Sequence, residues 1–100
     1  MARKFINQAK QIMIERKVKI INNAGLHTRP AATIVKLAAR YKSEFYINKD
    51  GINVNGKSII GVMTLAAEKG SEIILQFEGE DEEEAAEDII NFFNRGFDEL

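Results

Sequence analysis

EFYINKDGINV, residues 44–54, is the stretch that decides the fold class of this chain. Residues 44–48 and 52–54 are short runs typical of β-strands, and Asp50-Gly51 between them is a strong signal for a tight hairpin turn. Strands that are short and alternating, rather than fully apolar, favour an antiparallel sheet with one covered face. The segment therefore predicts an antiparallel sheet, to which the flanking segments add strands.

Two further strands are expected on either side of this hairpin. Residues 16–22 alternate, with Arg16, Val18, Ile20 and Asn22 on one side, which is the pattern of a half-buried strand. Residues 72–78 form a second such run, rich in Ile and Leu. The sequence thus predicts four strands.

Helical patterns occupy the segments between and after the strands. Apolar residues recur with helical period over 29–41 and over 85–97, and Pro30 falls in a first turn, where its missing N–H costs nothing. Ser58 is a suitable N-cap for a short helix over 59–65, and Asp81 for the last helix, whose first turn is acidic. The order strand, helix, strand, strand, helix, strand, helix predicts an α+β open-faced β-sandwich, with a four-stranded antiparallel sheet and three helices on one face (βαββαβα).

Composition excludes several kinds of chemistry. The 100 residues contain no Cys and one His, which excludes disulfides, thiolate metal sites, cysteine nucleophiles and multi-histidine zinc sites. No apolar run approaches the ~20 residues of a membrane-spanning helix, and the weakly helical first dozen residues lack the apolar core of a secretory signal. We therefore expect one small domain without a metal and without membrane insertion.

Charge is distributed unevenly along the chain. Residues 71–100 hold eleven of the fifteen acidic groups and one of the fourteen basic groups, while the net charge is −1. The basic residues are scattered and no aromatic side chains are interleaved with them, so they do not form the dense patch that nucleic-acid binding requires. We expect no nucleic-acid partner.

The single histidine lies in GLHTRPAA, residues 25–32. His27 is in the turn that opens a helix, where free N–H groups and the helix dipole attract an anion. Arg29 adds a guanidinium that suits phosphate oxygens. Taken alone, His27 is also explained as a residue that merely caps the helix, but the combination is able to hold a phosphoryl group on nitrogen.

The octapeptide resembles the active-site motif of HPr, the family of histidine-containing phosphocarriers of the phosphoenolpyruvate-dependent sugar phosphotransferase system. KSIIGVM, residues 57–63, resembles the second motif of that family, around a regulatory serine, and EGEDE, residues 78–82, resembles the segment before its last helix. The spacing of 31 residues from His27 to Ser58 also matches. The resemblance covers about residues 15–98, so we divide the chain into an N-terminal extension, 1–14, and an HPr-like phosphocarrier domain, 15–100.

The resemblance implies a cytoplasmic phosphocarrier rather than an enzyme in its own right. His27 would accept a phosphoryl group from phospho-Enzyme I on Nδ1 and pass it to Enzyme II A-type domains of sugar permeases, while Arg29 neutralises phosphate charge. Ser58 would be phosphorylated by HPr kinase/phosphorylase in bacteria that have one. Transcriptional regulators are further partners that the resemblance admits, and it implies no metal or organic cofactor.

Two groups of side chains are candidates for partner contacts. Residues 59–63 are more apolar than a short helix can bury, so we expect an exposed contact patch, although all of them could also be core. Arg29, Lys36 and Arg40 share one helix face and with Lys57 would form a basic collar, or only a solvated face. The candidate contact residues are Thr28, Lys36, Lys57, Ile59, Ile60 and Met63.

Other functions remain open at this level. A nitrogen-type or purely regulatory HPr paralogue is one alternative, and a small-molecule-binding α+β domain is another, which would leave GLHTRPAA unexplained. Ala24 departs from the family pattern, because many relatives carry a polar residue there. A protein that presents His27 to several partners is most simply a monomer.

Overall fold

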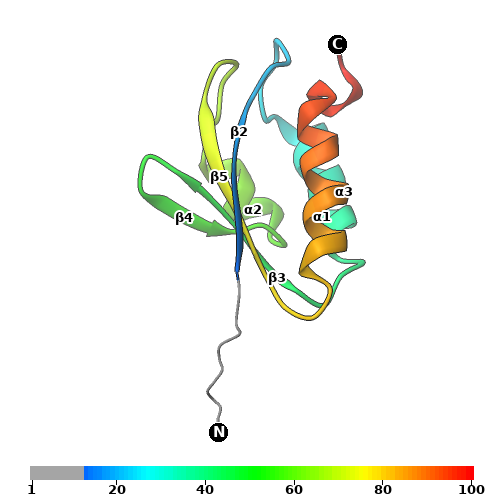
Figure 1. The fold of residues 1–100 in the computed structure, drawn as a ribbon. Coiled ribbons are helices and arrows are strands. Elements are labelled where there is room, and N and C mark those ends of the chain that lie inside the picture. Colours follow the sequence, from blue (N-terminus) through cyan, green and yellow to red (C-terminus); the bar gives the residue numbers. More distant parts are fainter. Residues whose placement is uncertain (1–12) are drawn as a thin grey trace, which may run out of the picture.

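The structure, a computed structural model, describes residues 13–100 (Figure 1). The weakly helical spacing at the start of the sequence falls almost wholly outside these residues. The predicted order of strands and helices is confirmed. The elements are β2 (Ile14–Lys19), α1 (Thr28–Ala38), β3 (Glu44–Lys49), β4 (Ile52–Asn55), α2 (Ile59–Thr64), β5 (Glu72–Glu78), α3 (Glu82–Asn94) and the 3-10 helix η1 (Gly96–Asp98).

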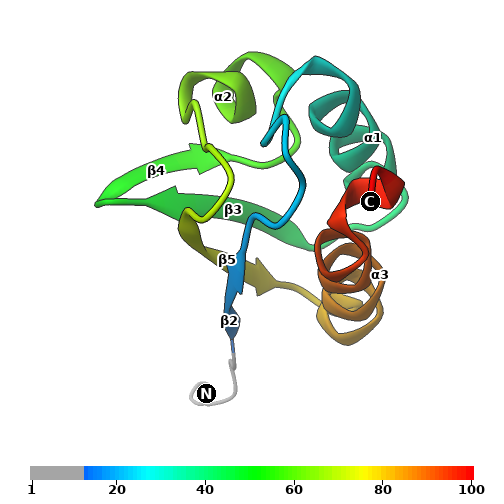
Figure 2. The ribbon, with the colours of Figure 1, turned by 90° about the horizontal axis from the view of Figure 1, so that it is seen from above.

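The four strands form one antiparallel sheet in the order β2-β5-β3-β4. All three α-helices lie on the same face of this sheet, as the view from above shows (Figure 2). The predicted α+β open-faced sandwich is therefore correct. Covering only one face explains why the strands alternate in polarity, since side chains on the other face meet water.

The hairpin between β3 and β4 turns at the predicted residues. Asp50 and Gly51 both have positive φ, 53° and 85°, as a two-residue turn of the type that matches strand twist requires. Lys49 pairs with Ile52 directly across the turn. This turn sets the register that carries Ile47 and Val54 to the covered face.

The core lies between the sheet and the helices. Phe45 and Phe77, which are paired across β3 and β5, stack with ring centroids 4.8 Å apart. Alternate residues of β5 (Ile73, Leu75 and Phe77) are completely buried. Burial of such side chains stabilises the domain by roughly 1.5–3 kcal/mol each before the entropy of ordering is counted.

Several element boundaries differ from the predictions, and the first strand already begins at Ile14. The first helix ends at Ala38 rather than at Tyr41, because the N–H groups of Arg40 and Tyr41 bond the carbonyls three residues earlier and close the helix with a tighter turn. The first strand ends at Lys19, although Ile20 still bonds Ser71 and Gly70 through its backbone. Apolar residues continue at helical or strand spacing past both ends, so the sequence predicted a helix and a strand that are longer than those in the structure.

The role predicted for Asp81 as a side-chain cap is wrong. Asp81 occupies the N-cap position of α3, but its carboxylate makes no bond to that helix. It instead accepts hydrogen bonds from the backbone N–H groups of Lys42 and Ser43, at 2.8 and 2.9 Å, and from the Ser43 hydroxyl. The carboxylate therefore fastens the loop after α1 to the start of α3.

The chain path brings its last residues to the start of α1. Helices α1 and α3 run in opposite directions, so the end of α3 lies beside the loop that leads into α1 (Figure 1). After α3, Phe97 and Asp98 adopt positive φ, 58° and 61°, and turn the chain back. Phe97, predicted as part of the helical stripe, packs from this turn against Phe92 and Phe93.

Candidate functional site

The loop before α1 is fixed by its backbone. Gly25 has φ +71°, and a Cβ atom there would lie 2.6 Å from the Ala67 carbonyl oxygen, so only glycine fits without strain. The Leu26 N–H donates to that same carbonyl at 2.9 Å. This close approach of two loops sets the position at which α1 begins.

His27 stands at the N-cap position of α1 with extended backbone, and its carbonyl accepts from Ala31 at 3.0 Å. Its side chain makes no capping bond to the helix. The imidazole Nε2 instead lies 2.7 Å from Oε2 of Glu99, and the side chain is 38% exposed. The interpretation of His27 as a mere helix cap therefore does not hold.

Glu99 is itself held on its other oxygen. The amide nitrogen Nδ2 of Asn22 donates to Glu99 Oε1 at 2.8 Å. Partial burial acts to raise the pKa of the Glu99 carboxyl, but hydrogen bonds from Asn22 and His27 and the nearby charge of Arg29 outweigh it and lower that pKa. Glu99 is therefore an ionised acceptor at neutral pH.

The geometry assigns the proton of the neutral imidazole ring. A carboxylate only accepts hydrogen bonds, so Nε2 carries the hydrogen that bonds Glu99. Within residues 13–100 no hydrogen bond involves Nδ1, which leaves its lone pair available. Thr28 and Arg29, both exposed, follow in the first turn of α1, where backbone N–H groups remain free for an anion.

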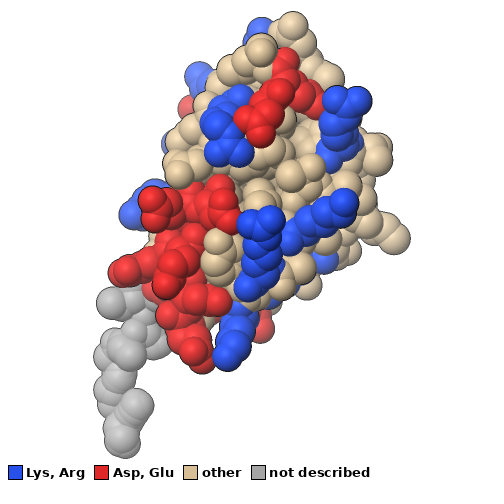
Figure 3. Space-filling view, turned by 90° about the vertical axis from the view of Figure 1, so that its right-hand side faces the viewer, with Lys and Arg blue, Asp and Glu red and all other residues tan. Residues whose placement is uncertain are grey.

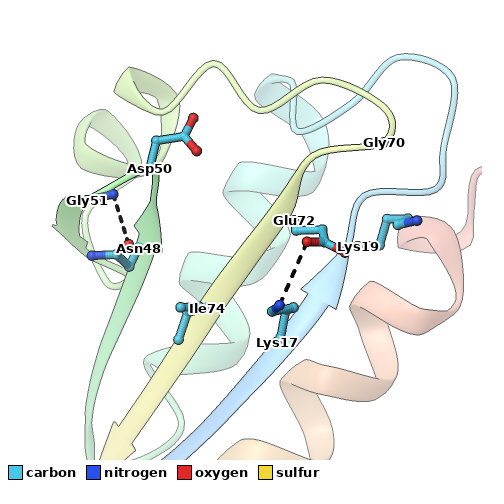
Figure 4. A pocket seen from close by; sticks show the side chains of 8 residues that line it. All are labelled: Lys17, Lys19, Asn48, Asp50, Gly51, Gly70, Glu72 and Ile74. Carbon is cyan, nitrogen blue, oxygen red and sulfur yellow. Dashed lines mark hydrogen bonds and ion pairs between the residues drawn. The ribbon is translucent and has the colours of Figure 1, made fainter.

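Two surface hollows differ in their relation to this site. One, of about 380 Å³, is lined by His27 together with Ala24, Leu26 and the loop around Ala66. The other, of about 520 Å³, lies on the uncovered face of the sheet and combines Lys17, Lys19 and Glu72 with the hairpin turn (Figure 4). The second hollow includes none of the predicted site residues.

The helix α2 exposes part of its apolar side chains, as expected. Ile60 is 75% exposed, and Ile59 and Met63 are exposed to 39% and 37%, whereas Val62 is completely buried. The alternative that all of them are core is thus wrong. Ser58 caps α2, since its Oγ accepts from the Gly61 N–H at 3.2 Å. Helix α2 packs against α1, and the two helices lie side by side on the covered face of the sheet (Figure 2).

Two of the four side chains of the expected basic collar, Arg40 and Lys57, already have partners within the chain. Arg40 lies 3.9 Å from Asp88 of α3, and Lys57 donates its ammonium to the Tyr41 carbonyl at 2.8 Å. Lys36 is exposed near the end of α1. On the side of the molecule formed by α1 and α3, basic side chains lie directly beside an acidic cluster (Figure 3). The face is therefore mixed in charge, not a uniform basic patch.

Neither a metal site nor a membrane span is found in the described part of the chain. Residues 13–100 contain no cluster of three or more His, Cys, Asp or Glu side chains that could hold a metal ion. None of their helices has the length and apolar character needed to cross a membrane.

Asn22 and Glu99 were not predicted as site residues. A signal existed for Asn22, because the alternation of residues 16–22 places a polar side chain on the same side as Val18 and Ile20, and all three are buried. No local signal marks Glu99, since its contacts with Asn22 and His27 span 77 and 72 residues of sequence.

Comparisons with known proteins agree on one family. A family model described as the PTS HPr component phosphorylation site matches residues 14–95. The phosphocarrier protein HPr of Treponema pallidum is 46% identical over 87 residues, which cover 87% of this chain and 99% of that relative. The HPr-like protein Crh of Halalkalibacterium halodurans is 48% identical over 83 residues, covering 83% and 99%.

Solved structures of the same kind share the fold. The crystal structure of HPr-C-His from Thermoanaerobacter tengcongensis matches with a TM-score of 0.83 at 39% identity, covering 87% of this chain and 98% of that one. An HPr dimer from the same organism matches with a TM-score of 0.68 at 40% identity, covering 80% and 92%. Monomeric state thus remains a prediction for this chain. The sequence, the sheet topology and the position of His27 agree with these matches, and the chain belongs to the HPr family of the phosphotransferase system.

Proposed function

We propose that this chain is a cytoplasmic phosphocarrier that accepts a phosphoryl group on His27 Nδ1 from phospho-Enzyme I. It then passes the group to Enzyme II A-type domains in bacterial sugar uptake. The observation that carries the proposal is the state of the imidazole: Glu99 binds Nε2 at 2.7 Å, and Nδ1 has no partner within residues 13–100. A shuttle needs a nucleophile that is exposed to successive partners, and the His27 ring is 38% exposed.

The surroundings of His27 support phosphate binding. The first turn of α1 supplies free N–H groups and the positive end of the helix dipole. Arg29, exposed in that turn, supplies a guanidinium able to bind two phosphate oxygens at once. These groups stabilise the negative charge of a phosphoryl group both as it arrives and as it leaves.

Partner docking is assigned to the α2 patch and the start of α1. Ile59, Ile60 and Met63 offer exposed apolar surface, and Thr28, Lys36 and Lys57 are the polar residues that we include in the contact. Phosphorylation of Ser58 would place roughly −1.5 to −2 charges beside this patch. That charge would repel an acidic docking site and so regulate transfer.

A purely regulatory paralogue is the second candidate. It is favoured by the 48% identity to an HPr-like protein Crh, which is close to the 46% identity to an HPr. A protein regulated through Ser58 alone has no need of a histidine held by a carboxylate. His27 and Glu99 therefore favour the phosphocarrier over this candidate.

The experiment that tests the proposal is incubation with phosphoenolpyruvate and Enzyme I, followed by mass measurement before and after mild acid. We expect one added phosphate that acid removes, because phosphate on imidazole nitrogen is acid-labile. His27→Ala should gain none. Label that survives acid, or that persists in His27→Ala, contradicts the assignment, and an unlabelled wild-type chain that is folded would favour the regulatory paralogue.

A further inference from the structure

A buried amide lies behind the acceptor histidine. Asn22 is completely buried, and its Nδ2 donates to two acceptors, the Gly25 carbonyl and Glu99 Oε1, both at 2.8 Å. Its Oδ1 is buried without a hydrogen-bond partner in the described part of the chain. Burying an amide oxygen in this way is unfavourable, and such groups in native proteins call for an explanation.

The orientation of this amide is determined by its neighbours. Turning the Asn22 side chain over would place Oδ1 against a carbonyl and a carboxylate, which are both acceptors. Asn22 therefore presents a donor to Glu99 even though its own oxygen is left unpaired. The unfavourable unpaired oxygen thus belongs to the residue that holds Glu99, and Glu99 in turn binds the imidazole.

We infer that Asn22 and Glu99 are positioning residues for His27: the buried amide holds the Glu99 carboxylate, and the carboxylate keeps the ring proton on Nε2, so that Nδ1 is the nucleophile. The inference rests on the proposed function, because it explains how a phosphoryl acceptor at His27 is prepared. The lowered pKa of Glu99 supports it, since only the ionised carboxylate serves as an acceptor on both oxygens.

The chemistry of the transfer shows what this arrangement contributes. The lone pair of Nδ1 forms the new bond to phosphorus, the bond from phosphorus to the donor breaks, and its electron pair returns to the donor. The proton on Nε2 stays in place throughout. As the ring gains positive charge in the transition state, the Glu99 carboxylate 2.7 Å away stabilises it.

A single isosteric substitution separates positioning from other roles. In Glu99→Gln the Asn22 donor still selects the amide oxygen, so the new NH2 group faces His27 Nε2. An NH2 group needs an acceptor there, which favours the tautomer with the proton on Nδ1. The substitution thus blocks the nucleophile without removing a buried side chain.

The test uses the full chain, unphosphorylated and labelled with 15N, and measures the ring-nitrogen chemical shifts of His27 at a pH where the ring is neutral. We expect the wild type to carry the proton on Nε2, Glu99→Gln to shift toward Nδ1–H, and Asn22→Ala to show a mixture. Phosphoryl acceptance from Enzyme I should fall roughly ten- to hundredfold in Glu99→Gln, as for loss of one charge-assisted hydrogen bond.

Glu87→Gln is the matched control. It removes the same charge from an exposed residue of α3, whose side chain makes no hydrogen bond or ion pair within residues 13–100. It should keep the wild-type tautomer and the wild-type rate. A wild-type ring protonated on Nδ1, or a Glu99→Gln ring unchanged in tautomer, overturns the inference.

The two proposals fail in different ways. A wild-type chain that takes no phosphate refutes the proposed function, while the tautomer measurement on the unphosphorylated protein still decides the positioning role. If Asn22→Ala does not fold, Glu99→Gln decides alone, because Glu99 is near the surface and its replacement keeps the side-chain volume. Slower transfer with an unchanged tautomer also overturns the inference.

Discussion

Glu99 Oε2 lies 2.7 Å from His27 Nε2, although 72 residues separate the two in the chain. The side chains are 38% and 18% exposed, so the contact is a partly buried hydrogen bond from the neutral ring to the carboxylate. The value of the contact is therefore in orientation. It fixes which ring nitrogen bears the hydrogen.

The first prediction concerns Arg29. Arg29→Ala should change the free energy of unfolding by less than about 0.5 kcal/mol, because the side chain is exposed in the first turn of α1. Phosphoryl transfer should nevertheless slow by an amount worth roughly 1.5–3 kcal/mol, since a charge-assisted contact to phosphate is lost. Urea unfolding and kcat/KM with Enzyme I measure the two effects.

Arg16→Ala is the control for Arg29. It removes an exposed guanidinium of β2, and within the described residues the Nη1 of this group donates only to the neighbouring Glu15 carbonyl. This variant should match the wild type in both measurements. Equal losses of stability and transfer in Arg29→Ala would show that Arg29 is structural.

The second prediction concerns Ser58. Ser58→Asp should keep a near-native Tm, because a carboxylate can accept the Gly61 N–H and complements the start of a helix. Transfer from Enzyme I should slow at least about tenfold, equivalent to ~1.4 kcal/mol. The defect should shrink in 1 M salt, where the Debye length is ~3 Å.

Asn53→Asp is the control for Ser58→Asp. It adds the same charge on β4, where Asn53 pairs with Asn48 and lies on the uncovered face of the sheet. Its transfer rate should stay at the wild-type value. Unfolding of Ser58→Asp would mean that Ser58 is mainly a structural cap, and an unchanged rate at low salt would show that the docking face is misplaced.

The third prediction contrasts two residues of α2. Ile60→Ala should leave the free energy of unfolding within about 0.5 kcal/mol, since Ile60 is 75% exposed, but should raise KM for Enzyme I. Val62→Ala should lower stability by ~2 kcal/mol, because it removes two methyl groups from a completely buried position. A destabilised Ile60→Ala with unchanged KM would remove the patch from the docking surface.

The fourth prediction concerns acid and Asp81. Hydrogen bonds from the Ser43 hydroxyl and from the Lys42 and Ser43 N–H groups lower the pKa of Asp81 from its ordinary value of 3.8, against an opposing effect of burial. A carboxyl with a lowered pKa in the folded state stabilises the fold above its unfolded pKa, and this contribution is lost as pH falls through the folded pKa. Asp81→Asn should therefore have a lower Tm than the wild type at pH 7.

That difference in Tm should narrow below about pH 3.8, as the pH falls through the lowered pKa of Asp81 in the folded state. Thermal unfolding by circular dichroism from pH 7 to pH 2 measures it. Glu80→Gln, a change of equal charge at an exposed neighbour, should show no such convergence. A gap that is constant with pH would assign the effect to something other than ionised Asp81.

Most of the fold was predictable because the signals are local. The Asp50-Gly51 turn and the strand over 72–78 were placed correctly, since turn conformation and alternation depend on adjacent residues. The end of α1 was misplaced because Tyr41 keeps helical spacing in the sequence. In the structure its hydroxyl instead donates to Asp88 of α3 at 2.7 Å, a contact that spacing does not reveal.

Only those candidate site residues that lie in short sequence motifs were predictable. His27, Arg29 and Ser58 lie in short motifs, and the first two share one helical turn. Glu99 reaches His27 because Gly96, Phe97 and Asp98 all adopt positive φ and reverse the chain. Of these three, only Gly96 is a residue type that signals such a turn, and it does not show which residue the reversed chain will contact. A contact between residues so far apart in the chain produces no periodic pattern in the sequence.

The separation of His27 and Glu99 has a consequence for synthesis. A ribosome adds roughly 5–20 residues per second, so the histidine is made roughly 4–14 s before the carboxylate that holds its ring. The ring of His27 is thus held only after Glu99 has been made. A nascent chain that has not reached Glu99 presents the GLHTRPAA motif without the carboxylate that holds the ring.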